Sequence, residues 1–170
     1  MRIGFMTFGL LKADFDDPSV RGFVDRIGDV FDVAEGAGGF ISHAAYGTPE
    51  WGARVVPRFA EGALNRAAGT LSIWEDVEAV SIYALVGVHS EALRRREEWF
   101  PPADQPNHVA WWIEDDHIPM WQEGCEKIEA LHDNGSTPDA FSVRSPFDMD
   151  GDPLTLDPAK MNHYQKVSRR

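Results

Sequence analysis

The sequence predicts an α+β fold in which a four-stranded antiparallel sheet carries helices on one face, with a further helix appended toward the C-terminal end. Four short segments are rich in apolar and aromatic residues, which is typical of buried strands. Longer segments with apolar residues at helical spacing lie between the first and second of these, and between the third and fourth. The chain has 170 residues, of which 43% are hydrophobic, enough for one domain with its own core.

The first part of the chain predicts a strand, a helix and a second strand. Residues 3–11 are apolar and aromatic and predict the first strand. The Asp-Pro pair at 17–18 suits a helix start, and apolar residues then recur at helical spacing over residues 23–34. Glycines within residues 36–39 end this helix, and residues 40–46 predict the second strand.

The next part repeats this order after a long connection over residues 47–68. Residues 70–74 predict the third strand, and residues 108–113 predict a fourth, very aromatic strand. Residues 75–100 predict a helix in two pieces, because a glycine interrupts its middle and two prolines follow it. Residues 119–132 predict the appended helix, which an Asn-Gly pair terminates.

This order of elements predicts how the sheet is built and how it is covered. Two split β-α-β units give the ferredoxin-like arrangement. Helices on one face leave the other face bare, and a second copy of the chain would bury it. We therefore expect a homodimer packed sheet to sheet, that is, a dimeric α/β barrel.

The domain is expected to cover residues 1–147 and to be followed by a tail. Residues 148–170 are polar with little hydrophobic pattern, which indicates a tail that is partly extended or disordered. Truncation after Pro146 is therefore expected to leave the fold standing.

Composition indicates which partners and which cellular compartment to expect. The formal net charge of -12 repels phosphate backbones and anionic bilayers, so no nucleic acid and no membrane are expected as partners. One cysteine, Cys125, allows no disulfide within the chain and no multi-cysteine zinc site. No secretory signal or membrane-spanning run is recognisable, and a cytoplasmic location is expected.

Several ordered motifs resemble an uncharacterised bacterial family defined only as a domain of unknown function. They include LSIWEDVE at residues 71–78 and HSEALRRREEWF at residues 89–100. A third begins at residues 111–112 with two tryptophans and continues to TPDAF at residues 137–141. The opening TFGLL at residues 7–11 is also similar, and the resemblance covers most of residues 1–147.

This resemblance implies a fold and a dimer. The family is similar to members of the dimeric α/β-barrel superfamily, which also holds the antibiotic-biosynthesis monooxygenases. The chain departs from the pattern at Met120, Asp139 and Leu85, where Thr, Tyr and an aromatic residue are expected. Because of these three departures, the substrate of this chain is not expected to follow from the family pattern.

His89 is the leading catalytic candidate. It follows a helix break, and a histidine there can move a proton near neutral pH or bind haem iron. The alternative is that His89 caps the helix. One arginine of residues 94–96 is expected to face inward and hold a carboxylate or enolate oxygen, and Arg95 is the candidate. Surface pairing with Glu91, Glu97 or Glu98 is the alternative role.

Aromatic residues on the strands predict a pocket for a planar ligand, although a role in the core is the alternative. Alternation along a strand sends Trp111 and Trp112 to opposite faces. His117 follows an acidic run and is a further candidate or a loop anchor, and no metal site is expected there. The candidate catalytic residues are His89, Tyr83, His117 and Arg95, and the candidate substrate-binding residues are Trp74, Trp99, Trp111, Trp112 and Phe8.

These features favour a small-molecule enzyme of specialised or catabolic metabolism. Its substrate would be a hydrophobic, aromatic or polyketide-like compound, and its reaction a cofactor-independent oxygenation. Three alternatives stay open: a cyclase or isomerase that works by proton transfer, a haem-dependent enzyme with His89 or His117 as axial ligand, and a binding protein without turnover. The sequence predicts no cofactor, and haem is the cofactor that the second alternative would require.

Overall fold

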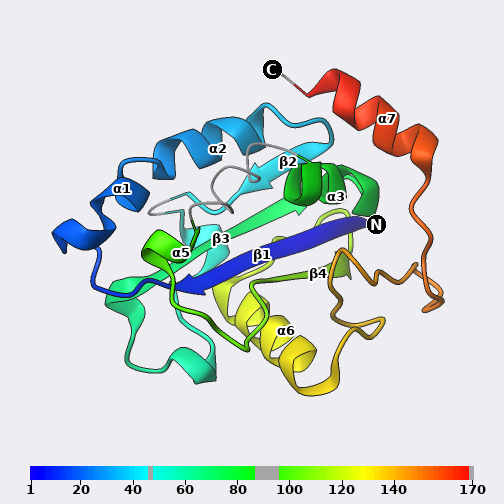
Figure 1. Cartoon of the computed structure of the whole chain (residues 1–170). Coiled ribbons are helices and arrows are strands. Elements are labelled where there is room, and N and C mark those ends of the chain that lie inside the picture. Colours follow the sequence, from blue (N-terminus) through cyan, green and yellow to red (C-terminus); the bar gives the residue numbers. More distant parts are fainter. Residues whose placement is uncertain (46–47, 87–95, 169–170) are drawn as a thin grey trace.

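The computed structural model describes residues 1–45, 48–86 and 96–168 and shows an α+β fold around one four-stranded antiparallel sheet (Figure 1). The strands are β1 (Arg2–Leu10), β2 (Phe40–His43), β3 (Ala67–Trp74) and β4 (His108–Ile113). Their order is β2-β3-β1-β4, and every neighbouring pair is antiparallel. The four predicted strands are confirmed, with β3 beginning three residues earlier than the 70–74 predicted.

The helices largely follow the predicted spacing. The helix expected over residues 23–34 is split into two, and the appended helix ends before Gly135, whose φ of 71° suits the left-handed region. The helices are α1 (Arg21–Val24), α2 (Ile27–Glu35), α3 (Val77–Val86), α5 (Arg96–Trp99), α6 (Trp121–Asn134) and α7 (Pro158–Val167). In Figure 1, α2 lies beside β2 and α6 lies toward β4.

One face of the sheet packs against α3. The register aligns Ile3 with Trp74 and Trp112 on this face, and Phe5 lies two residues along β1. Ile3, Phe5 and Trp74 share a buried cluster with Val80 and other residues of α3, and the half-buried Trp112 packs against it. Alternation along β4 places Trp112 on this side and Trp111 on the other, so the prediction that they point to opposite faces is confirmed.

The opposite face packs against α6, which corrects the expectation that it is bare. Met6, Leu71 and Trp111 lie in one buried cluster with Ile128 of α6. Gly4 allows this packing, since a Cβ there would lie 2.6 Å from Cε2 of the Trp111 indole. The helix after β4 thus buries apolar surface that a second copy of the chain was expected to cover.

The tail contains a helix that the polar composition did not predict. Asp157 caps α7, because its side chain accepts a hydrogen bond from the Ala159 amide at 2.8 Å. Tyr164 is 8% exposed and packs with the α3 cluster, and Leu154 and Leu156 contact the same cluster. A helix therefore lies in the segment where an extended or disordered tail was expected.

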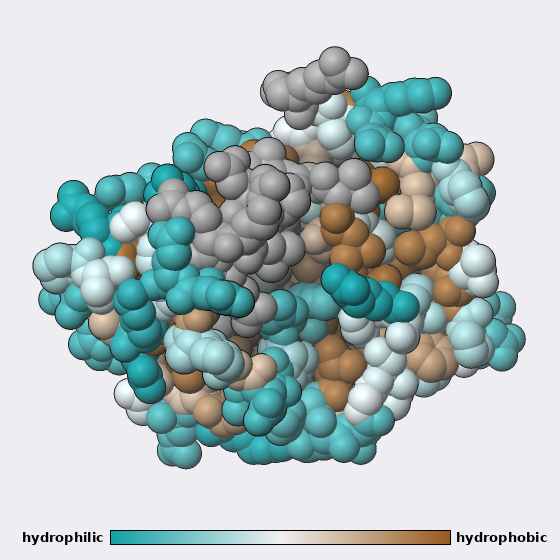
Figure 2. Space-filling model, in the orientation of Figure 1, coloured by the Kyte–Doolittle hydropathy of each residue, from teal (hydrophilic) through white to brown (hydrophobic). Residues whose placement is uncertain are grey.

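The surface is largely hydrophilic on the face shown in Figure 2, where teal residues outnumber brown ones outside the grey atoms. Among the described residues, no helix has the length and apolar character that crossing a membrane requires.

Candidate functional site

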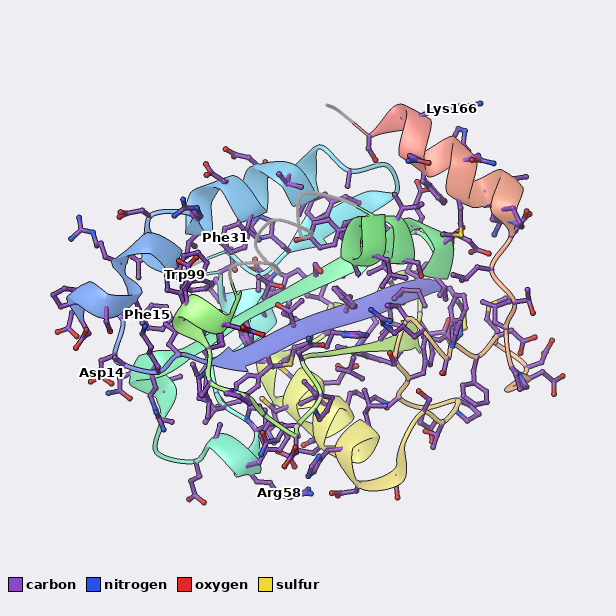
Figure 3. All side chains as sticks on the ribbon, in the orientation of Figure 1. Asp14, Phe15, Phe31, Arg58, Trp99 and Lys166 are labelled. Carbon is purple, nitrogen blue, oxygen red and sulfur yellow. The ribbon has the colours of Figure 1, made fainter. Side chains whose placement is uncertain are left out.

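A cavity of about 770 Å³ lies where the α3 face of the sheet continues past α3 toward the C-terminal end of β1. Its walls come from segments far apart in the sequence: β1 and the segment after it, α1 and α2, the connection after β2, the start of β3, the end of α3, α5, the start of β4, the start of α6, and residues 143–144. Figure 3 shows three of its lining residues gathered there, Phe15, Phe31 and Trp99. A cavity of this volume accommodates a drug-sized molecule.

Most of the cavity wall is aromatic or aliphatic. Phe23 of α1 meets Phe100 edge to face, with ring centroids 5.2 Å apart, and its centroid lies 6.0 Å from that of Trp99. Phe100 lies on the sheet at Gly9, where a Cβ would come within 2.8 Å of the Phe100 ring. The lack of a side chain at Gly9 therefore leaves room for the Phe100 ring. The aromatic lining residues are Phe5, Phe8, Phe15, Phe23, Phe31, Trp99, Phe100 and Trp121.

Polar groups on the strands form a short row across the floor of the cavity. Thr7, Thr70 and His108 are register partners on β1, β3 and β4, so their side chains share one face. The hydroxyls of Thr7 and Thr70 lie 2.7 Å apart and share a hydrogen bond.

His108 is held by hydrogen bonds at both ring nitrogens. Nδ1 lies 2.7 Å from the side-chain oxygen of Asn107, which only accepts, so Nδ1 donates. In the neutral ring Nε2 then accepts, and the hydroxyl of Ser142 donates to it over 3.0 Å. This chain fixes the tautomer and puts the basic nitrogen of His108 next to a hydroxyl that can relay a proton.

Three arginines line the cavity. The guanidinium carbon of Arg26 lies 5.7 Å from the ring centroid of Trp99, and that of Arg54 lies 5.4 Å from the ring centroid of Trp121. Arg144 is the third. No aspartate or glutamate lines the cavity among the residues that the structure describes.

Two of the predicted residues, Phe8 and Trp99, line this cavity. Leu85, one of the departures from the family pattern, lines it as well. His89 and Arg95 lie outside the described residues.

Trp74 and Tyr83 lie in the core instead. Trp74 is fully buried and donates to the Ser72 hydroxyl over 2.9 Å, and its ring centroid lies 4.8 Å from that of Tyr83. Burial raises the pKa of Tyr83 to about 12, so its hydroxyl keeps its proton at neutral pH. Neither residue lines the cavity.

Trp111, Trp112 and His117 lie elsewhere too. The Trp111 indole donates to one carboxylate oxygen of Glu123 over 2.7 Å, and the His117 ring lies 2.7 Å from the other. The Trp112 indole donates to the Phe147 carbonyl over 2.8 Å. Glu123 thus joins Trp111 of β4 to the loop that carries His117. His117 therefore has the alternative role that the sequence allowed, that of a loop anchor.

The single cysteine is buried in the α6 cluster. Cys125 is 2% exposed, and burial raises the pKa of its thiol to about 12, with smaller contributions from Glu129 and Glu126. A thiolate at this site is therefore disfavoured at neutral pH. No group of three or more metal-ligating side chains occurs within residues 1–45, 48–86 and 96–168.

Sequence reasoning missed His108, the threonine pair and the three cavity arginines. The signal for His108 was alternation along β4, which puts it on the same face as Trp112. No comparable signal existed for Arg26, Arg54 or Arg144, because they belong to three separate segments.

One comparison with known proteins identifies a family. A protein family described as a domain of unknown function, DUF3291, matches residues 2–155. No curated protein and no solved structure matches the chain.

Proposed function

Since the chain belongs to the DUF3291 family, whose description assigns no activity, we propose from the cavity alone that it is a small-molecule enzyme for a hydrophobic aromatic or polyketide-like compound. The observation that carries the proposal is a volume of about 770 Å³ bounded mainly by aromatic and aliphatic side chains with a few polar groups. Stacking against such walls favours planar ligands.

The reaction we propose is a proton transfer, as in a cyclase or isomerase. His108 is the titratable cavity residue that supports it, since its basic nitrogen faces the Ser142 hydroxyl at 3.0 Å. The pair would take a proton from an acidic carbon of the ligand. Thr7 and Thr70 would hydrogen-bond to the enolate oxygen that results.

The relation to monooxygenases of the dimeric α/β-barrel superfamily is also a proposal. The strand order β2-β3-β1-β4 supports a ferredoxin-like arrangement. Cofactor-independent oxygenation would begin with the same loss of a proton. A homodimer stays part of this proposal, but α6 covers the sheet face that the sequence analysis assigned to the partner.

Binding is tested by filling the cavity from its edge. Leu85 lines the cavity and is 41% exposed, whereas Leu64 is 47% exposed and lies outside it. Calorimetric titration with anthraquinone-2-carboxamide, a planar uncharged probe, should show binding to the wild type and to Leu64→Trp. Leu85→Trp should weaken it about tenfold or more by occupying the same space. Equal binding by all three proteins would contradict a ligand site in this cavity.

Catalysis is tested with anthrone, a three-ring ketone whose methylene carbon can lose a proton. Proton transfer predicts enzyme-dependent deuterium incorporation at that carbon in D₂O, without oxygen uptake. Oxygenation instead consumes one O₂ and gives anthraquinone and water. His108→Gln should reduce either reaction about a hundredfold, while His163→Gln, an exposed histidine on α7, should not. His108→Gln with the native rate would rule out His108 and direct attention to His89→Ala.

A further inference from the structure

The charge of the cavity wall is opposite to the charge of the molecule. The chain carries 28 acidic and 16 basic side chains, a formal net charge of -12. The described cavity wall nevertheless carries three arginines and no carboxylate. An acidic protein repels anions from most of its surface, whereas a cavity wall with arginines and no carboxylate attracts them.

Arg26 and Arg54 have N–H groups that form none of the hydrogen bonds described below. Arg26 donates to the Gly22 carbonyl and Arg54 to the Ala67 carbonyl, and each guanidinium also lies over a tryptophan ring. A guanidinium has five N–H groups, so these contacts leave most of them available. Neither arginine forms an ion pair with a carboxylate of the described residues.

Two arginines outside the cavity form ion pairs with carboxylates. Arg21, five residues before Arg26, pairs with Asp25 at 3.0 Å. Arg58, which Figure 3 shows far from Phe31 and Trp99, pairs with Glu129 at 3.2 Å. The cavity arginines therefore carry charge that is not neutralised by a described carboxylate.

We propose that the natural ligand of this cavity is an anion, an aromatic molecule that bears a carboxylate. The inference rests on the proposed function and names the chemical class of its ligand. The aromatic walls bind the ring system, and the guanidinium of Arg26 or Arg54 forms charge-assisted hydrogen bonds with the carboxylate. The stacked tryptophan rings limit the motion of each guanidinium, which lowers the entropy lost on binding.

The test compares two probes that differ chiefly in charge. Anthraquinone-2-carboxylate and anthraquinone-2-carboxamide have the same ring system and nearly the same shape, and both are titrated calorimetrically into the full chain. The carboxylate should bind about tenfold or more tightly than the amide, and added salt should reduce this preference. Arg26→Gln and Arg54→Gln together should remove most of it. Arg21→Gln should preserve it, although it removes one positive charge from the same region.

A second pair of variants avoids changing the arginines. Leu85→Glu places a carboxylate on the cavity wall, and Leu64→Glu makes the same change of charge outside it. The first should weaken carboxylate binding about tenfold or more and affect the amide less, because like charges repel at short range. The second should leave both probes unchanged.

The outcomes separate this inference from the proposed function. If both probes bind equally to the wild type, the ligand site stands and the anionic ligand is wrong. If neither probe binds, the proposed aromatic ligand site fails, and the inference fails with it. If the carboxylate is preferred but the double arginine variant keeps the preference, Arg26 and Arg54 are not its source and the inference is overturned.

Discussion

Tyr164 should account for much of the stability that α7 contributes. Its ring packs against the glycines that follow α2, where a Cβ on Gly39 would come within 2.8 Å of the ring. Its hydroxyl lies 3.0 Å from a carboxylate oxygen of Glu75 and 3.1 Å from one of Asp76. Replacing this residue by Phe removes the hydrogen bond alone, and replacing it by Ala removes the ring as well.

The expected magnitudes follow from these contacts. A hydroxyl has one proton, so Tyr164→Phe removes one hydrogen bond to a charged acceptor, about 1.5 kcal/mol at the lower end of the usual range. The lower end applies because Asp76 also pairs with Lys160 at 3.1 Å and keeps that partner in the variant. Tyr164→Ala should cost about 3 kcal/mol, the lower end for truncating a buried aromatic, since the helix lies at the edge of the fold.

Urea unfolding followed by circular dichroism measures both changes. Deletion of residues 157–170 should cost at least as much as Tyr164→Ala, and Lys166→Ala, an exposed position on the same helix, should change stability by less than about 0.5 kcal/mol. A deletion that leaves the free energy of unfolding unchanged would refute the docking of α7. It would restore the earlier expectation that the chain folds fully without its tail.

Two further predictions concern pH and assembly. Burial raises the pKa of Tyr83 from 10.0 to about 12 in the folded state, so its contribution to stability should be fully present below about pH 10 and lost as the pH rises toward 12. Urea unfolding between these pH values should show this loss, and Tyr83→Phe should remove its share; an identical pH dependence in the variant would contradict it. Sedimentation velocity of the full chain at micromolar concentration should show the homodimer that the sequence predicts. A single monomeric species would exclude it.

The spacing of apolar residues along the sequence was enough to locate the strands and most of the helices of this fold. The alternation of side chains along β4 placed Trp111 and Trp112 on opposite faces, and helical spacing located α2, α3 and α6 to within a few residues. These features depend on residues close in sequence, because strand and helix periods are properties of the local backbone. The role of α6 did not follow, since a helical period shows that one side is apolar without showing which sheet face receives it.

The candidate site was decided by tertiary structure. Phe8 and Trp99 were expected at a ligand site, but the arginines and His108 join them only because β1, β4, α1 and the connection after β2 converge at one end of the sheet. The docking of α7 has the same origin. Its polar sequence shows little hydrophobic pattern, and Tyr164 becomes buried because Gly38 and Gly39 leave room for its ring beside α3. Sequence fixes the periodicity of each segment, whereas a cavity exists only between segments whose relative positions the packed core sets.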